Sequence, residues 1–407
     1  MLKIINAQDI HGKSVELSYS NKIDDCLDAK GLTVFPGLID PHVHFRIPGL
    51  EHKEDWITAS KAAISGGYTT VFDMPNTLPP TITKKYLHEK KSLIDAQLIQ
   101  ANIPLHYHLF FGADKQHLDQ ISLVQHEIIG IKVFMGCSTG NLVIDDDESL
   151  HAVFKIASDL NLIVAVHAED EAILQTRKKQ ISANNYADHS NIRNIDVALS
   201  AVEKAISLCR KYHTKLYILH VSSKDEINCI KKAKQEGLPV YAETTPHHLF
   251  LNTSYYSTLH GKAVVNPPLR EESHQSSLFQ AIDDGTIDTI GSDHAPHTLD
   301  EKSLPYGQCP SGMPGIETTL PLLLNAYHQG KISLEKILSL TYKKPKEIFQ
   351  LHESNDIVLV DLNKTQTVNP SYLKTKCGWS SFSGLTLKGW PRYVILSGKC
   401  YDLTSLI

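Results

Sequence analysis

The chain alternates between short β-rich runs and longer helical stretches, and no other feature of the sequence constrains its fold as strongly. Parallel strands joined by crossover helices produce this alternation. The helical stretches carry end signals, such as the glycines that close KEDWITASKAAISGG and the acids that open DDESLHAVFKIASDLN. Eight β-rich runs follow one another, namely LTVFPGLIDPHVHF, YTTVFDMPNT, PLHYHLFFGA, IIGIKVFMG, LIVAVHAED, KLYILHVSS, LPVYAETTPHHLF and TIDTIGSDHAPH.

Eight βα units predict a (β/α)₈ TIM barrel over residues 36–354, since such barrels take ~250 residues and lengthen through insertions. A doubly wound open sheet is the main alternative. It would not bring side chains from all eight strand ends to one mouth, as a barrel does. At 407 residues the chain exceeds the usual size of one compact domain.

The two ends of the chain do not fit the barrel pattern. Residues 1–35 alternate in a β manner in KSVELSYSN, and residues 355–407 hold short strands broken by glycines, NDIVLVDLN and WPRYVILSG. We predict that both ends pair into one small composite β-sandwich beside the barrel. The alternative is that each end is a separate edge extension.

Composition and charge are ordinary for a soluble globular protein. The net charge of -5 comes from interspersed acids and bases, so we expect neither a nucleic-acid nor a membrane partner. The N-terminus turns polar after a few apolar residues, and no apolar run is long enough to cross a bilayer. Seven cysteines without a C-x-x-C pair argue for a reducing compartment. We therefore expect a cytoplasmic protein.

Metal-competent side chains recur at the C-terminal ends of the predicted strands, where the active sites of such barrels lie. His42 and His44 show this most clearly, because they are two residues apart and share one face of the first strand. A lone histidine on an apolar strand is usually a hydrogen-bonded core residue, but a set at several strand ends indicates a metal centre. The candidate ligands are His42, His44, Lys132, His167, His220 and Asp293.

Imidazole and carboxylate ligands without thiolate suit Zn²⁺, with Mn²⁺ or Co²⁺ as alternatives. Four histidines and an aspartate exceed what one ion with an open position needs, and they favour two ions with a bridge. Lys132 fits such a cluster as a neutral amine, or as a carbamate formed with CO₂ that supplies a bridging carboxylate. The residues alone leave open the alternative, a strand-end lysine paired with an acid.

The order of the motifs resembles that of the amidohydrolase superfamily, and specifically that of the dihydroorotases. The resemblance spans the predicted barrel and reaches the tail. It implies a binuclear zinc site that contains all six candidate ligands, with Lys132 carboxylated. It rests on GLIDPHVHFRIPG, GGYTTVFDMPNT, GIKVFMGCSTGN, VHAED, HVSS, ETTPHHLFL, NPPLR, GSDHAPH and KCGWSSFSG.

The implied reaction is the reversible cyclisation of N-carbamoyl-L-aspartate to L-dihydroorotate, a step of de novo pyrimidine biosynthesis. In the ring-opening direction, a hydroxide that bridges the two ions would attack the ring amide carbon. Asp293 would take the proton and pass it to the leaving nitrogen. The alternative role for Asp293 is that of a metal ligand only.

Arg46 carries the choice of substrate. A guanidinium binds a carboxylate through two hydrogen bonds, and dihydroorotate has a carboxylate beside its ring. The similar allantoinases tend to have asparagine here, and hydantoinases (dihydropyrimidinases) lack the arginine, so a related cyclic amidase is the second candidate. A catalytically silent, dihydroorotase-like structural subunit is the third. The presence of all six ligands argues against that third candidate.

The resemblance assigns further residues to the substrate. Several of them stand beside proline or glycine, and a role as turn residues alone is the alternative. One departure from the family pattern falls in HSNIRN, where Asn194 replaces a proline and puts the conformation of that loop in doubt. The implied substrate-binding residues are His44, Arg46, Asn76, Asn266, His297, Ser311 and Gly312.

The resemblance also bears on partners. Dimers are common among dihydroorotases, so a homodimer is expected. A further partner to test is the preceding enzyme of the pathway, aspartate carbamoyltransferase.

Overall fold

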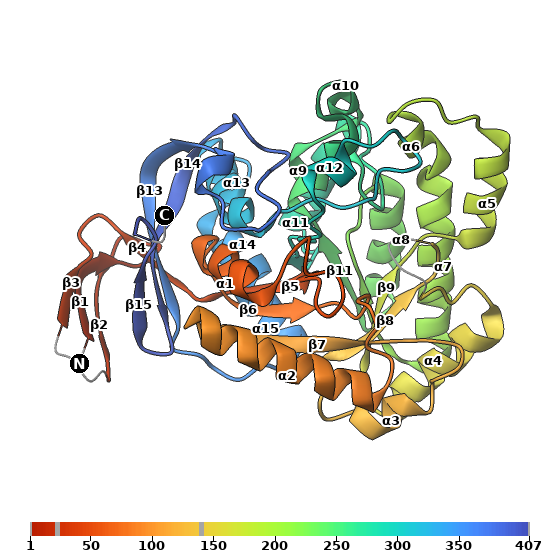
Figure 1. The fold of residues 1–407 in the computed structure, drawn as a ribbon, viewed down its shortest axis with the longest axis horizontal. Helices are drawn as coiled ribbons and strands as arrows, with labels where there is room; N and C mark the ends of the chain where they lie inside the picture. Colours follow the sequence, from red (N-terminus) through yellow and green to blue (C-terminus); the bar gives the residue numbers. More distant parts are fainter. Residues whose placement is uncertain (1, 21–24, 138–141, 406–407) are drawn as a thin grey trace.

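The computed structural model describes residues 2–20, 25–137 and 142–405. Eight parallel strands form a barrel with helices packed around it (Figure 1), which confirms the predicted fold class. Part of the GIKVFMGCSTGN motif, residues 138–141, lies outside the described residues. In chain order, each pairing with the next, the strands are β5 (Leu38–Val43), β6 (Tyr68–Asp73), β7 (His106–Gly112), β8 (Gly130–Phe134), β9 (Ile163–His167), β10 (Lys215–Ile218), β11 (Val240–Thr244) and β12 (Thr289–Ile290).

The first and last strands meet and close the barrel. A parallel bridge joins Val43 to His294, and the backbone N–H of His44 donates to the His294 carbonyl at 2.8 Å. These contacts lie just beyond the C-terminal ends of β5 and β12, which is where the candidate ligands cluster. Closure thus brings the two ends of the predicted ligand series, which are about 250 residues apart, into contact.

Helices begin where the sequence offers caps. Asp55 accepts a hydrogen bond from the backbone N–H of Thr58 at the start of α1, and Asp146 does the same for Ser149 at the start of α4. Both helices fall inside the predicted stretches. The helices are α1 (Trp56–Ser65), α2 (Lys84–Ala101), α3 (Gln120–Val124), α4 (Asp147–Asp159), α5 (Glu171–Gln180), α6 (Asp188–Ile192), α7 (Ile195–Tyr212), α8 (Lys224–Gln235), α9 (Pro246–Phe250), α10 (Tyr256–Leu259), α11 (Glu272–Asp283), α12 (Leu299–Lys302), α13 (Ile316–His328), α14 (Leu334–Leu338) and α15 (Lys344–Ile348). Short 3₁₀ turns, η1 (Thr253–Tyr255), η2 (His260–Ala263) and η4 (Pro370–Tyr372), and a π-helical turn, η3 (Ser339–Lys343), complete them.

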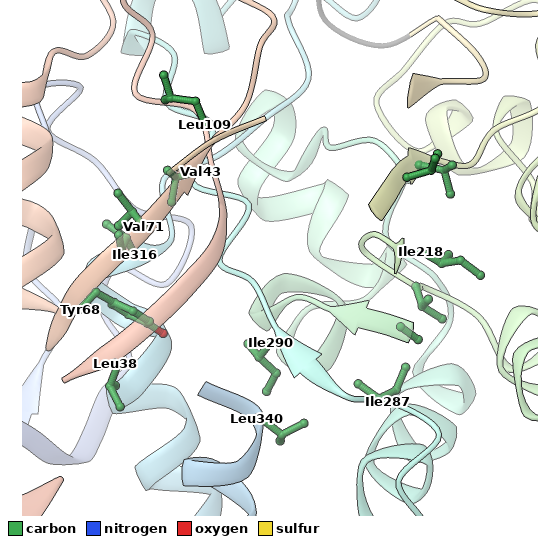
Figure 2. Close-up of a cluster of buried hydrophobic side chains, with 14 of the residues drawn as sticks. Leu38, Val43, Tyr68, Val71, Leu109, Ile218, Ile287, Ile290, Ile316 and Leu340 are labelled. Atoms are coloured by element: carbon green, nitrogen blue, oxygen red, sulfur yellow. The ribbon is translucent and has the colours of Figure 1, made fainter. Parts of the chain in front are cut away.

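The side chains of the barrel strands divide between two cores because successive residues point to opposite faces. Val71 packs in the large cluster between strands and helices, where Figure 2 shows it with Leu38, Tyr68 and Ile316. The next residue, Phe72, belongs to the cluster inside the barrel. There Phe349 packs edge-on against it, with ring centroids 4.9 Å apart. Side chains therefore fill the barrel below the strand ends.

The two ends of the chain form one composite β unit beside the barrel, as predicted (Figure 1). It is a single seven-stranded sheet in the order β15-β14-β13-β4-β1-β2, with β3 also paired to β1. Leu2, Ile4, Leu359 and Ile395 are among the buried side chains of its own small core. The strands are β1 (Leu2–Gln8), β2 (Ser14–Tyr19), β3 (Asp25–Asp28), β4 (Thr33–Pro36), β13 (Ile357–Thr367), β14 (Thr386–Leu396) and β15 (Lys399–Asp402).

Two expectations from the sequence concerned the cysteines and the absence of an apolar run long enough to cross a bilayer. All seven cysteines lie within the described residues, and each is a free thiol. Over residues 2–20, 25–137 and 142–405, no helix combines the length and the apolar character needed to cross a bilayer.

Candidate metal centre

The C-terminal strand ends bring all six predicted metal ligands to the lining of one cavity. His42 and Lys132 lie within β5 and β8, whereas His220 and Asp293 follow β10 and β12 by two and three residues. The cavity between these side chains has a volume of about 30 Å³, which is enough to admit water. Besides the six ligands, the cavity is lined by Arg46, Asn76, Phe134, Asn266, Ala295, Ser311 and Gly312.

Among the described residues, His42, His44 and Asp293 form a group of potential metal ligands whose ligand atoms all lie within 4.8 Å of one another. Asp293 Oδ1 lies 3.3 Å from His42 Nε2 and 3.2 Å from His44 Nε2. The Nδ1 atom of His42 lies 2.7 Å from Glu243 Oε1. The Nδ1 atom of His44 lies 2.8 Å from Asn76 Oδ1.

These contacts determine which kind of ion His42, His44 and Asp293 can bind. Glu243 and Asn76 offer oxygen acceptors, so each histidine donates its Nδ1 hydrogen and keeps a lone pair on Nε2. Both Nε2 lone pairs then point at the Asp293 carboxylate, which is also an acceptor. A cation placed among these three acceptors would satisfy all of them. This part of the site therefore fits a divalent metal ion held by two imidazoles and a carboxylate.

His167 and His220 form a second pair of ligands. His167 Nδ1 lies 2.9 Å from His220 Nε2, and His167 Nε2 lies 2.9 Å from Glu169 Oε2. Glu169 accepts the Nε2 hydrogen, which leaves the Nδ1 lone pair facing His220. Arg193 forms an ion pair with the same carboxylate and holds it in place. This arrangement, a ligand histidine backed by a carboxylate, is the common one at metal sites.

Burial adjusts the protonation of the candidate ligands in the direction that metal binding needs. It lowers the pKa of His42 to about 3 and holds the pKa values of His44 and His220 well below the usual range. It also lowers the pKa of Lys132 to about 7. Neutral imidazoles offer lone pairs to a metal, and a neutral amine is the form that reacts with CO₂.

Sequence reasoning missed the two carboxylates that contact the ligand histidines, Glu169 and Glu243. Glu243 accepts hydrogen bonds from the Tyr217 hydroxyl at 2.9 Å and from the backbone N–H of His220 at 3.3 Å, in addition to its contact with His42. Burial raises the pKa of Glu243 to about 8, and a cation at the neighbouring ligands would favour its ionised form. The sequence did offer one signal, an acidic residue inside a β-rich run. A buried acid needs a hydrogen-bonding or charged partner, so such a residue indicates a further polar group nearby.

Three of the site residues have left-handed backbone conformations, which residues other than glycine rarely adopt. They are Arg46 (φ 70°), His220 (φ 41°) and Asp293 (φ 45°). Such strain persists only where the surrounding structure fixes it, and it concentrates at functional positions. Here the turns directly after the strands aim these side chains into the cavity.

The predicted substrate residues fall into two groups. Arg46 lines the cavity and is buried, and its Nε donates to the Pro296 carbonyl at 3.0 Å. Asn76, Asn266, Ser311 and Gly312 line the cavity as well. His297 is fully buried and does not line it, but its Nε2 lies 3.1 Å from Arg46 Nη2. Its position is therefore behind the arginine.

The HSNIRN segment is ordered despite its departure from the family pattern. His189 Nε2 lies 3.0 Å from Asn266 Oδ1 and thus fixes a residue of the cavity. Asn194 precedes α7 in an extended conformation (φ −65°, ψ 179°). That backbone conformation is accessible to proline, so the asparagine occupies a position that proline could also take.

The chain matches the model of the Amidohydrolase family over residues 33–400. It is 36% identical to the dihydroorotase of Halobacterium salinarum over 361 residues, which cover 86% of this chain and 82% of the relative. It is 33% identical to the dihydroorotase of Methanosphaera stadtmanae, with 91% and 85% of the two chains covered. Among solved structures, it resembles the L-hydantoinase (dihydropyrimidinase) from Arthrobacter aurescens with a TM-score of 0.90 and 25% identity, over 98% of this chain and 96% of that one.

The protein belongs to the amidohydrolase family. The resemblance to dihydroorotases that the motifs indicated is confirmed by these relatives, which match over most of the chain. The structural neighbour carries a different name, so the family does not by itself fix the substrate.

Proposed function

We propose that this protein is a dihydroorotase, which catalyses the reversible cyclisation of N-carbamoyl-L-aspartate to L-dihydroorotate in de novo pyrimidine biosynthesis. The observation that carries the proposal is the placement of Arg46. Its guanidinium lines the same small cavity as the candidate metal ligands, where a ring carboxylate would lie beside the reacting amide. The names of the sequence relatives agree with this substrate.

The proposed metal centre takes two divalent ions, preferably Zn²⁺, with Mn²⁺ or Co²⁺ as alternatives. When bound, the ions would activate a water molecule and polarise the amide carbonyl. Lys132, as its carbamate, would join the two halves of the centre. The first half comprises His42, His44 and Asp293, and the second half comprises His167 and His220.

The protein's own groups carry the proton transfer. In ring opening, the water oxygen bonds to the amide carbon, the bond from that carbon to the ring nitrogen breaks, and the nitrogen needs a proton. Asp293 would accept a proton from the water and deliver it to this nitrogen. In ring closure the same carboxylate would work in the opposite order.

Arg46 and its neighbours would bind the carboxylate and the ring. The guanidinium is buried and offers two N–H groups in one plane, which matches a carboxylate. We propose that Asn76 shares that carboxylate, that Asn266 and the Ser311–Gly312 backbone bind the ring, and that His44 contacts the substrate from the metal side. His297 would act through Arg46, because it lies behind the cavity.

Related cyclic amidases, such as allantoinase or hydantoinase, are the alternative, and so is a catalytically silent subunit. Their test is direct. The purified, zinc-loaded protein is given L-dihydroorotate, allantoin and hydantoin in parallel. Turnover of dihydroorotate alone supports the proposal, turnover of the uncharged rings supports the alternative enzymes, and the absence of any turnover with both metals bound supports the silent subunit.

Three further proposals concern the whole protein. We propose a division into a catalytic barrel, residues 36–354, and a terminal β-sandwich-like unit, residues 1–35 and 355–407. We also propose a cytoplasmic homodimer; sedimentation analysis tests the dimer, and cell fractionation tests the location. Association with aspartate carbamoyltransferase remains a proposal that co-sedimentation of the two purified enzymes tests.

A further inference from the structure

Lys53 stands outside the predicted site but behind one of its residues. Its side chain is buried, and its Nζ lies 3.0 Å from His297 Nδ1 and 2.9 Å from Glu301 Oε1. The other ring nitrogen of His297 faces two groups. Its Nε2 lies 3.1 Å from Arg46 Nη2 and 3.0 Å from the Ser311 carbonyl. One imidazole thus lies between a lysine and an arginine.

A neutral imidazole has one N–H and one lone pair, so it cannot satisfy all of these neighbours at once. Burial and the nearby Arg46 guanidinium hold the pKa of His297 well below its usual value, which keeps the ring neutral. Lys53 and Arg46 only donate hydrogen bonds, and the Ser311 carbonyl only accepts them. The choice of tautomer therefore decides which neighbour is left without a hydrogen bond to the ring.

The two tautomers can be compared contact by contact. With the hydrogen on Nε2, Nδ1 accepts from Lys53 and Nε2 donates to the Ser311 carbonyl, so two contacts are hydrogen bonds. With the hydrogen on Nδ1, Nε2 accepts from Arg46, but the contact with the carbonyl is lost. Nδ1–H then faces the Lys53 ammonium, and its nearest carboxylate oxygen, Glu301 Oε2, is 3.7 Å away, beyond hydrogen-bond distance. The first tautomer is favoured as long as Lys53 is present.

We propose that Lys53 is a positioning residue that holds His297 in the Nε2–H tautomer and so keeps Arg46 Nη2 available to the carboxylate of the substrate. In this tautomer His297 accepts nothing from Arg46, and no other acceptor for Nη2 lies within hydrogen-bond distance among the described residues. The tautomer follows from the contacts alone. Only the identity of the anion rests on the proposed function.

Two hydrogen bonds hold the His297 backbone and the Arg46 side chain in place. The indole Nε1 of Trp379 donates to the His297 carbonyl at 2.7 Å, and Arg46 Nε donates to the Pro296 carbonyl at 3.0 Å. Neither hydrogen bond involves the imidazole nitrogens of His297 or the Nη2 atom of Arg46. Removing the Lys53 ammonium therefore leaves His297 and Arg46 where they are, but lets the imidazole change tautomer and accept from Arg46.

The tautomer is measured by two-bond ¹⁵N–¹H correlation spectra of the protein labelled with [¹⁵N]histidine, with His297→Gln used to assign the signal. We expect the Nε2–H pattern in the parent protein and in Lys53→Arg, and the Nδ1–H pattern in Lys53→Met. Lys61→Met, which removes a lysine from the adjacent helix α1, is the matched control and keeps the parent pattern. The same tautomer in Lys53→Met as in the parent would overturn the proposal.

Kinetics give the second readout. Lys53→Met should raise KM for L-dihydroorotate about tenfold, with kcat changed less than about twofold and with metal content unchanged, because one charged hydrogen bond to the bound anion is lost. Lys53→Arg should restore KM. An unchanged KM in Lys53→Met would overturn the link to the substrate. A parent protein that does not turn over dihydroorotate would defeat the proposed function instead, and the spectra would still decide the tautomer.

Discussion

At the scale of single residues, Lys132 sets how the candidate centre depends on pH. It is buried at the strand ends, and its Nζ lies 4.7 Å from the centroid of the Phe134 ring. Burial lowers the pKa of its ammonium to about 7. The neutral amine is thus the major form above pH 7, whereas an exposed lysine stays charged up to about pH 10.

We therefore expect carbamate formation on the metal-free protein to increase as the pH rises through about 7. The measurement is the ¹³C NMR carbamate signal after addition of ¹³C-bicarbonate, followed from pH 6 to 9 (about one unit or more on either side of the midpoint). Lys132→Met should lack the signal. A signal that appears only near pH 10, at about the pKa of a free lysine, would contradict the expectation.

The sequence indicated the candidate ligands more readily than the residues that contact them. His42 and Asp293 were recognisable because metal-competent side chains at successive strand ends form a repeating pattern. Glu243 stands 201 residues from His42 in the chain yet lies 2.7 Å from it, and no local pattern carries such a pairing. For the same reason the position of His297 behind Arg46, and not in the cavity, emerged only in three dimensions.

At the scale of elements, a loop of the tail, residues 373–380, is anchored on the barrel beside the centre. The backbone N–H groups of Lys374 and Thr375 donate to Glu317 on α13, and that of Lys376 donates to Glu54 at 3.1 Å. The indole of Trp379 reaches the His297 carbonyl. The closing motif of the sequence, KCGWSSFSG, is thus a structural link between the tail and the residues behind the cavity.

We expect Glu54→Ala to lower the free energy of unfolding by about 2 kcal/mol, because the backbone N–H of Lys376 and the Thr375 hydroxyl lose their buried acceptor. Chemical denaturation measures the change. Glu203→Ala, at an exposed glutamate of helix α7, is the control and should lie within about 0.5 kcal/mol of the parent. Equal effects of the two substitutions would argue against an anchoring role for Glu54.

Strands were easier to predict than the short helices around them. Each barrel strand is a compact apolar run that must be buried on both faces, and this leaves a clear mark on the sequence. The helices α9 (Pro246–Phe250) and α12 (Leu299–Lys302) have five and four residues and follow strand-end motifs. Their formation depends on tertiary contacts, which local patterns do not reveal.

At the scale of the whole molecule, one sheet joins the two ends of the chain. Strand β4 pairs antiparallel with β13, with Val34 opposite Leu359. Both strands flank the barrel in sequence. Strand β5 begins two residues after β4 ends, and β13 is the first strand after helix α15. The alternating pattern predicted strands at both ends, but the order in which they pair depends on contacts between residues more than 300 positions apart.

We expect Leu359→Ala to lower the free energy of unfolding by about 2–5 kcal/mol, because the fully buried side chain leaves a cavity in the core of the terminal sheet. Urea denaturation measures it. Leu385→Ala, at a leucine that is 39% exposed, is the control and should cost less than about 1 kcal/mol. A Leu359→Ala variant as stable as the control would mean that the terminal sheet contributes little to global stability.

The central claim is that Arg46 selects a substrate with a ring carboxylate at the metal centre. The most direct test compares kcat/KM for L-dihydroorotate and for hydantoin in the zinc-loaded parent and in Arg46→Ala, with metal content measured in both. We predict turnover of dihydroorotate by the parent and a loss of about 100-fold or more in the variant at unchanged metal content, as expected for a buried guanidinium–carboxylate pair. Hydantoin turnover by the parent, or equal dihydroorotate turnover by the two proteins, would contradict the claim.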